Sequence, residues 1–367
     1  NVEDGAMQQA RDLANLPFTF KWVALMPDCH QGYGMPIGGV LATTDVIIPN
    51  AVGVDIGCGM CAIKTSLTNI DTDALKSILG QIRSVIPVGF SHHKEKQTWT
   101  GFDDAPDIPI IQNQLEKAKY QLGTLGGGNH FLEIQSDTEG FIWIMIHSGS
   151  RNFGLKIATE YHRKAKEMCT KWHSDIPTND LSFLPYDSHD GIEYIDAMRF
   201  AMEFAKENRF YMLHEIKAIF KANFYNIIFD EIINIHHNYA SIEKHFGKHV
   251  IVHRKGATSA KHGETGIIPG SQGSKSYIVT GKGNRESFMS CSHGAGRKMG
   301  RKQAINELDF EQEKAFLESQ NILHSIRNKK DLDEACGAYK DINTVINNQL
   351  DLIDIMVELS PLAVIKG

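Results

Sequence analysis

Glycine-rich stretches lie on either side of a long helical segment, and this arrangement constrains the fold more than any other feature of the 367-residue chain. From about residue 22 to 64, short apolar runs broken by glycine and proline predict strands joined by tight turns. A second glycine-rich zone covers about residues 250–300. Between them, about residues 153–224 carry apolar side chains at helical spacing, which predicts helices packed against a core. The length allows about two domains, but the mixture of strands and helices favours one α+β unit with a helical insertion at 153–224.

Other segments have equally definite expected structures. Residues 72–86 place apolar side chains three and four apart and predict a helix. The run Phe141–Ile146 is continuously apolar between Gly140 and His147, as expected of a buried central strand. Two further helices are expected at about 310–325 and 342–359.

The composition excludes several classes of protein. With 42% hydrophobic and 22% charged residues, the chain is neither disordered nor collagen-like. Six cysteines in 367 residues are too sparse for a disulfide scaffold, and no apolar run approaches the roughly 18 residues that span a bilayer. The acidic start Asn1–Asp4 is unlike a signal peptide, so we expect a reduced, cytoplasmic protein without a membrane partner. A first residue other than Met is consistent with a truncated N-terminus.

Side chains that can bind a metal occur on glycine-rich turns and at the ends of apolar segments. Asp55 and Cys58 share one such turn, His130 follows three glycines and an Asn, His147 ends the most apolar strand, and His237 ends another apolar segment. A thiolate, a carboxylate and imidazoles are the ligands of a borderline transition metal such as Zn, Mn or Fe. Each residue alone has a structural alternative, since a histidine at a strand end is often a surface or core residue and a cysteine is often a small buried apolar one. The spacing leaves both interpretations open.

Two glycine-rich loops, Gly266–Ser274 and Ser292–Arg297, combine small residues with hydroxyl or basic groups. Backbone N–H groups in such loops can bind phosphate oxygens, although the loops can equally be simple tight turns. Neither the Walker A pattern nor the dinucleotide-binding glycine pattern occurs, so a P-loop NTPase is excluded.

Nine motifs along the chain closely resemble those of the RtcB family of RNA-splicing ligases. They are MPDCHQGYG (26–34), AVGVDIGCGM (51–60), GTLGGGNHF (123–131), HSGSR (147–151), HHNY (236–239), RKGA (254–257), SCSHGAGR (290–297), AYKD (338–341) and the terminal IKG (365–367). They occur in the family's order from about residue 26 to the last residue. The resemblance implies a single RtcB-type catalytic domain over residues 1–367, with central β-sheets and glycine-rich loops.

The activity implied by the resemblance is that of a GTP-dependent RNA ligase for RNA repair or tRNA splicing. Such an enzyme joins an RNA 3′-phosphate or 2′,3′-cyclic phosphate to a 5′-hydroxyl through a histidine–GMP intermediate at a dinuclear Mn(II) centre. The resemblance leaves open which RNA is the substrate and whether an archease-type activator is needed.

The resemblance also implies roles for individual residues. Cys58 corresponds to the thiolate that bridges both metals, with His147 and His237 completing one metal site and Asp55 and His130 the other. His293 matches the guanylylated histidine. The positions implied for contact with the guanosine nucleotide are Asn129, Glu133, Ser271, Ser276, Gly294, Ala295, Gly296, Arg297, Tyr339 and Lys366. The basic positions suited to RNA phosphate are Arg151, Arg254 and Lys255.

Two other functions compete with this interpretation. A metal-dependent phosphoesterase or nuclease would use the same ligands, but hydrolysis does not require a histidine nucleophile such as His293 on a separate loop. A non-enzymatic RNA-binding protein would not need the whole ligand set. The formal charge of −6 argues against RNA on charge alone, yet basic residues lie in or beside the motifs, so we expect a positive surface near His293.

Overall fold

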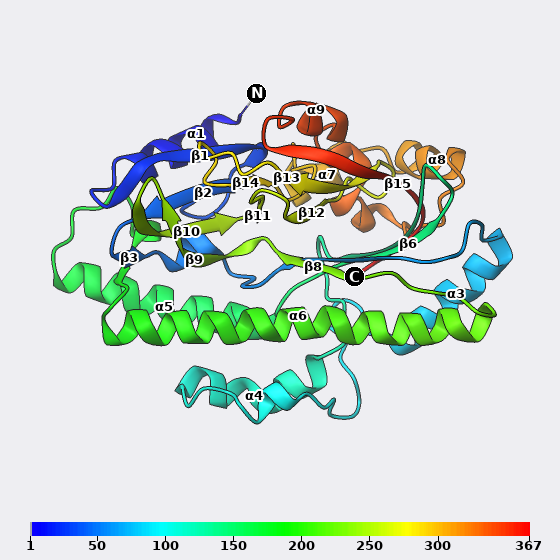
Figure 1. The fold of residues 1–367 in the computed structure, drawn as a ribbon, viewed down its shortest axis with the longest axis horizontal. Coiled ribbons are helices and arrows are strands. Elements are labelled where there is room, and N and C mark those ends of the chain that lie inside the picture. Colours follow the sequence, from blue (N-terminus) through cyan, green and yellow to red (C-terminus); the bar gives the residue numbers. More distant parts are fainter. Residues whose placement is uncertain (1) are drawn as a thin grey trace.

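A seven-stranded sheet forms the centre of the computed structural model, which describes residues 2–367 (Figure 1). Its strands, in spatial order, are β12 (Thr265–Ile268), β13 (Ser276–Gly281), β15 (Ile353–Lys366), β5 (Phe131–Asp137), β6 (Ile142–Ser148), β4 (Gly59–Lys64) and β8 (Ile233–His236). All neighbouring strands are antiparallel. Every residue of β6 is buried, which confirms the predicted central strand.

A second, four-stranded sheet joins the two glycine-rich zones. Its strands, in spatial order, are β1 (Thr19–His30), β2 (Ile37–Thr43), β10 (Lys248–Lys255) and β9 (Asn238–His245). Two smaller pairs are β11 (Ala257–Ser259) with β14 (Ser290–Ser292), and β3 (Val46–Ile47) with β7 (Leu184–Pro185). The chain passes from the large sheet to this one between β8 and β9, and His237 is the single residue at that junction. The α+β prediction is therefore confirmed.

The helical segment is part of the core. It consists of α5 (Arg151–Lys171) and the 35-residue α6 (His189–Asn223), which spans most of the width of the molecule in Figure 1. Phe204 of α6 packs with apolar side chains of α5, and Phe220, sixteen residues on, packs with those of the large sheet and α3 (Thr72–Val85). One apolar face of α6 thus closes two parts of the core, which fixes the large sheet against the helices.

Short helices cover the remaining surface. They are α1 (Asp4–Ala14), α2 (Pro49–Val52), α4 (Pro109–Gln121), α7 (Arg301–Glu307), α8 (Phe310–Ser319), α9 (Ile342–Asn347) and the 3₁₀ turns η1 (Thr100–Phe102), η2 (Asn179–Leu181), η3 (Lys329–Glu334) and η4 (Cys336–Ala338). None of the helices described for residues 2–367 has the length and apolar content that a membrane crossing requires.

The prediction for the C-terminal segment is wrong in its second half. A helix was expected over 342–359, but α9 ends at Asn347 and the long strand β15 begins at Ile353. Apolar side chains at 353, 355, 357 and 359 alternate with a period of two, which suits a strand. Hydrogen bonds to β13 on one side and β5 on the other then decide the structure, and these distant partners leave no trace in the local pattern. The helix expected at 310–325 also ends early, at Ser319.

Candidate active site

The predicted metal ligands lie where several strands of the large sheet begin or end. Strand register brings these points together, because Gly59 is paired with both Ser148 and His236, and Phe131 with His147. Cys58 immediately precedes Gly59, and His130 immediately precedes Phe131. Ligands that are distant in sequence therefore meet at one edge of the sheet.

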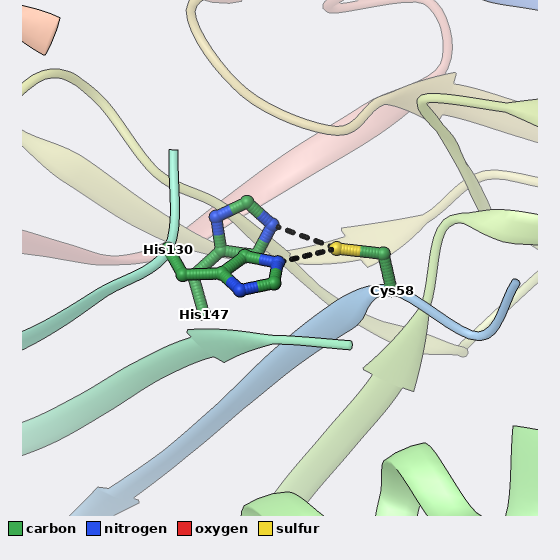
Figure 2. A group of neighbouring side chains, drawn as sticks. All are labelled: Cys58, His130 and His147. Atoms are coloured by element: carbon green, nitrogen blue, oxygen red, sulfur yellow. Dashed lines mark hydrogen bonds between the residues drawn. The ribbon is translucent and has the colours of Figure 1, made fainter. Parts of the chain in front are cut away.

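The side chains of these ligands converge. The Cys58 Sγ lies 3.3 Å from the His147 Nε2 and 3.5 Å from the His130 Nε2. Figure 2 shows both imidazole rings directed at the thiol. The His147 Nε2 is 3.3 Å from the His237 Nε2, and the His130 Nε2 is 3.0 Å from the Asp55 Oδ2. All five predicted metal ligands thus belong to one cluster.

The hydrogen bonds on the far side of two of the rings, those of His130 and His147, indicate a cation site. The Nδ1 of His130 lies 3.0 Å from the carbonyl oxygen of Leu125, and the Nδ1 of His147 lies 3.0 Å from that of Asn129. A carbonyl can only accept, so each Nδ1 carries the proton and each Nε2 of a neutral ring presents a lone pair to the cluster. If the His130 ring is neutral, its Nε2 and an Asp55 oxygen are two acceptors 3.0 Å apart. A cation between such groups would relieve their repulsion, so the donor set fits a bound metal.

Burial adjusts the protonation of the cluster. Burial and the neighbouring imidazoles lower the pKa values of His147 and His237 well below the usual range, so both rings are neutral ligands. Burial and the Asp55 carboxylate raise the pKa of the Cys58 thiol well above its usual value. A coordinated metal ion would supply the charge that removes this thiol proton.

Arg209 of α6 supports the cluster from behind, and the sequence interpretation gave it no role. Its Nη1 donates to the carbonyl oxygens of Gly57 at 3.0 Å and Ser148 at 2.8 Å, and its Nε donates to the Asn234 Oδ1 at 2.7 Å. One buried guanidinium thus ties together the turn before β4, the end of β6 and strand β8. A sequence signal existed, because Arg209 lies four residues after Ala205 on the apolar stripe of a predicted buried helix.

His293 lies beside the cluster, in the loop after β14. Its ring centroid is 4.8 Å from that of His237. The Asp28 Oδ2 accepts a hydrogen bond from the backbone N–H of His293 at 3.0 Å, and it lies 2.7 Å from the Nδ1 of the ring. Asp28 is completely buried. Because the Nδ1–H donates to this carboxylate, the opposite ring nitrogen, Nε2, is free to act as a nucleophile. Asp28 lies inside the first quoted motif, but nothing in the sequence linked it to His293.

Part of the predicted nucleotide set surrounds Glu133, which is buried on β5. Its Oε2 accepts from the Gln135 Nε2 at 2.6 Å, and the same Nε2 donates to the Ser276 Oγ at 3.1 Å. The Ser276 Oγ also accepts from the backbone N–H of Gly270 at 3.2 Å, next to Ser271. Burial raises the pKa of Glu133 to about 8. The Gln135 Oε1 has no partner within residues 2–367, which leaves an acceptor available in this group.

The basic members of the predicted nucleotide set gather around Glu334, a residue that the sequence interpretation missed. Arg297 Nη1 lies 3.1 Å from the Glu334 Oε1, Lys366 Nζ lies 3.9 Å from the Oε2, and the Tyr339 hydroxyl donates to the Oε2. The guanidinium of Arg297 also lies over the Tyr339 ring. This buried carboxylate holds three predicted nucleotide contacts in one place.

The remaining predicted nucleotide contacts are in the loops beside His293 and His147. Gly294 and Ala295 follow His293, and Gly296 has a φ of +72°. A Cβ atom at Gly296 would lie 2.1 Å from the carbonyl oxygen of Asp28, so only glycine allows this close approach. Asn129 contributes its backbone carbonyl to the orientation of His147.

The three predicted RNA contacts have different environments. Arg151 adjoins the cluster, with its Nη1 3.5 Å from the His130 Nδ1. Arg254 is fully buried and pairs with Glu243, whose Oε1 is 2.5 Å from the Arg254 Nη1. Lys255 is also buried, and its Nζ donates to the carbonyl oxygens of Tyr33 and Asn50. Burial lowers the pKa of Lys255 to about 7. The burial of Arg254 and Lys255 argues against the RNA contacts predicted for them, because both side chains already have hydrogen-bond partners inside the protein.

Replacement of Arg254 by alanine is expected to lower the free energy of unfolding by about 3–5 kcal/mol, because it leaves the Glu243 carboxylate buried without its partner. Urea-induced unfolding measures the loss. The control is Arg199→Ala, whose guanidinium is largely exposed and should cost no more than about 0.5 kcal/mol. If Arg254→Ala instead left the stability unchanged and weakened RNA binding, the prediction that Arg254 contacts RNA would stand.

Comparison with known proteins identifies the family of this chain. The family model described as tRNA-splicing ligase RtcB matches residues 9–108 and 100–367. The RNA-splicing ligase RtcB of Escherichia coli K12 is 38% identical over 391 aligned residues, which cover 100% of this chain and 95% of that protein. The tRNA-splicing ligase RtcB of Thermococcus kodakarensis is 31% identical, with 100% and 92% covered. The RNA-splicing ligase RtcB of Mycobacterium bovis is 30% identical, with 98% and 100% covered. With a family model and relatives that span the chain, this protein belongs to the RtcB family.

Proposed function

We propose that this protein is an RNA ligase that uses GTP and Mn(II) to join an RNA 3′-phosphate or 2′,3′-cyclic phosphate end to a 5′-hydroxyl end. The names of its relatives, RNA-splicing and tRNA-splicing ligase, support the class of reaction. The observation that carries the proposal is the position of His293, whose ring lies 4.8 Å from that of the metal-ligand candidate His237 and is oriented by the buried Asp28.

The five candidate ligands offer donors that suit Mn(II). Cys58 would be shared by two ions, His147 and His237 would complete one site, and Asp55 and His130 would complete the other. The support is that the Cys58 Sγ, the Nε2 atoms of His130 and His147 and an Asp55 oxygen converge in one cluster, with the His237 Nε2 3.3 Å from that of His147. When bound, the ions would neutralise phosphate charge and orient the displacement.

His293 is the nucleophile in the proposed first step. Its Nε2 attacks the α-phosphorus of GTP, so that an N–P bond forms and the P–O bond to pyrophosphate breaks. The Asp28 carboxylate accepts the Nδ1–H hydrogen bond, which fixes the tautomer and stabilises the positive charge that develops on the ring. An oxygen of the RNA 3′-phosphate then attacks the phosphorus of the adduct, so that a P–O–P bond forms, the N–P bond breaks and the His293 ring is released. Attack by the 5′-hydroxyl forms the new phosphodiester bond and expels GMP. A 2′,3′-cyclic phosphate must first be opened by water.

The nucleotide is expected to lie between the Glu133 group and the Glu334 group. Arg297 and Lys366 would supply positive charge to phosphate, and the loop from Gly294 to Gly296 would supply backbone N–H groups beside His293. Glu133 can accept hydrogen bonds from the N1–H and the exocyclic amino group of guanine, which adenine does not present in that arrangement.

Replacement of Glu133 by glutamine is expected to weaken the preference for GTP over ATP by about tenfold or more, because an amide cannot accept both guanine hydrogen bonds as a carboxylate does. The pH dependence tests the same role. Since burial raises the pKa of Glu133 to about 8, the carboxylate forms only as the pH rises through that value. The KM for GTP should therefore fall between neutral and alkaline pH in the wild type and stay flat in Glu133→Gln. An unchanged nucleotide preference in the variant would contradict this role.

Ligation itself tests the proposed function. An RNA fragment with a labelled 3′-phosphate end and a second fragment with a 5′-hydroxyl are incubated with the protein, Mn(II) and GTP. The expected result is a joined product that requires GTP and retains the labelled phosphate at the junction. A phosphoesterase would instead release the label as inorganic phosphate without GTP, and that outcome would replace the proposal.

A further inference from the structure

Phe90 is an exposed aromatic residue beside the candidate site. Its side chain is completely accessible to solvent, with a relative exposure of 101%. A single exposed apolar residue is common and by itself needs no explanation. Phe90 differs from an ordinary surface residue because hydrogen bonds fix its backbone on both sides, and one of them ties the preceding Gly89 to the loop that leads to His130.

The residues before Phe90 are tied directly to the site. The backbone N–H of Gly89 donates to the Gly126 carbonyl at 2.8 Å, and the Arg151 Nη2 donates to the Gly89 carbonyl at 3.2 Å. The other terminal nitrogen of Arg151 lies 3.5 Å from the His130 Nδ1. Arg151 thus links Gly89 to His130, a metal-ligand candidate, and Phe90 is the residue that follows Gly89.

The residues after Phe90 hold the loop in place. The N–H of Ser91 donates to the Val88 carbonyl at 3.2 Å, which closes a tight turn with Phe90 near its tip. The N–H of His93 donates to the Tyr120 carbonyl at 3.0 Å. A ring held in solvent by an anchored turn loses little backbone entropy when a ligand binds to it, so it is pre-organised for binding.

The surroundings of Phe90 favour a nucleic-acid ligand over a protein. Lys94 follows Phe90 in the chain with two histidines between Ser91 and it, and residues 74–94 contain no Asp or Glu. A protein partner would require a wider apolar patch around the ring. An exposed ring in a segment that carries basic but no acidic residues suits the binding of single-stranded nucleic acid by stacking, which tolerates any base.

We propose that Phe90 stacks on a nucleobase of the RNA strand whose end enters the candidate site, and that this contact positions the end near His130 and His293. The inference rests on the proposed function and extends it, because it names a residue that contacts RNA where the burial of Arg254 and Lys255 argues against theirs. Base stacking without sequence readout suits an enzyme that acts on the ends of RNA strands.

The test is the affinity for a short single-stranded RNA with a 3′-phosphate, measured by fluorescence anisotropy. Phe90→Ala should weaken binding by about tenfold, the loss expected for one stacked base. Phe90→Trp should restore affinity to within about twofold of wild type, whereas Phe90→Leu, which is apolar but not flat, should not. Tyr225→Ala is the matched control, because Tyr225 is 94% exposed in the segment after α6 and should bind RNA like the wild type.

A second RNA that lacks the bases nearest its 3′-phosphate separates stacking from other effects. Wild type should lose about tenfold affinity for this abasic RNA, and Phe90→Ala should lose almost nothing further. The inference is overturned if Phe90→Ala binds intact RNA within about twofold of wild type, or if the two losses simply add. Formation of the GMP adduct by the wild type is measured in parallel. Absence of that adduct would refute the proposed function, whereas the RNA affinities report on Phe90 alone.

Discussion

Replacement of His293 by alanine is expected to abolish the covalent GMP adduct and to lower the ligation rate by more than about 10³-fold, the usual consequence of removing a nucleophile. The structural reason is that His293 combines two properties. Its Nδ1 lies 2.7 Å from the buried Asp28 carboxylate, and its ring lies 4.8 Å from that of His237. An alanine leaves Asp28 without the ring it orients and leaves no nitrogen beside the metal cluster.

The adduct is measured by incubating the protein with Mn(II) and α-labelled GTP, followed by denaturing electrophoresis. A phosphoramidate is labile in acid and stable in base, which distinguishes it from a phosphate ester. His249→Ala is a suitable control, because His249 is an exposed histidine on β10. A labelled band that persists in His293→Ala would remove the proposed mechanism, while loss in both variants would indicate a general defect in folding.

Local sequence patterns predicted those elements whose structure is decided locally. The apolar run before His147 predicted β6, and apolar spacing of three and four residues predicted α3, where the Asp71 side chain also caps the helix by accepting from the backbone N–H groups of Asp73 and Ala74. Strand β15 could not be predicted in this way. It is defined by hydrogen bonds to β13 and β5, which precede it by about 75 and 220 residues in the sequence.

The candidate site was predictable as a set of residue types but not as a set of contacts. The motifs named the five metal-ligand candidates that lie together in the structure, since glycine-rich turns and strand ends mark where they lie. They did not predict that Asp28 orients His293, that Glu334 collects Arg297 and Lys366, or that Arg254 is neutralised by Glu243. Each of these pairs joins distant segments or neighbouring strands. Burial decides whether such a charge is available to a ligand, and burial follows from tertiary packing.

The pairing of basic residues with Glu334 lowers the net positive charge expected near His293. Basic residues near His293 were expected to make that surface positive despite the formal charge of −6. Glu334 now offsets part of the charge of Arg297, Arg301 and Lys366. These cations remain close to the place expected for nucleotide phosphates, where Glu334 keeps them ordered before a ligand binds. The positive potential stays a prediction.

Replacement of Cys58 by alanine is expected to reduce Mn(II)-dependent ligation by more than about 10²-fold. Loss of a residue that hydrogen-bonds to a metal ligand costs up to about 10²-fold in activity, and loss of the ligand itself should cost at least as much. The reason is the position of the Cys58 Sγ, which lies 3.5 Å from the His130 Nε2 and 3.3 Å from the His147 Nε2. In the proposed arrangement these histidines belong to different metal sites. Loss of the thiol should therefore weaken the binding of both ions, whereas loss of His237 should weaken the binding of one.

Cys61 supplies the matched control for this prediction. It lies on β4, three residues after Cys58, and is equally buried, but it packs in the apolar core with Leu132 and Ile146 instead of facing the metal-ligand candidates. Cys61→Ala should keep the wild-type number of bound Mn(II) ions per chain and most of the activity. Metal content measured by atomic spectroscopy, alongside ligation rates, then separates coordination from packing. If Cys58→Ala retains two ions and full activity, the thiol does not bridge two metal ions. If only one of the two ions is lost, Cys58 is a ligand of a single metal, and the bridging role must be given to another group.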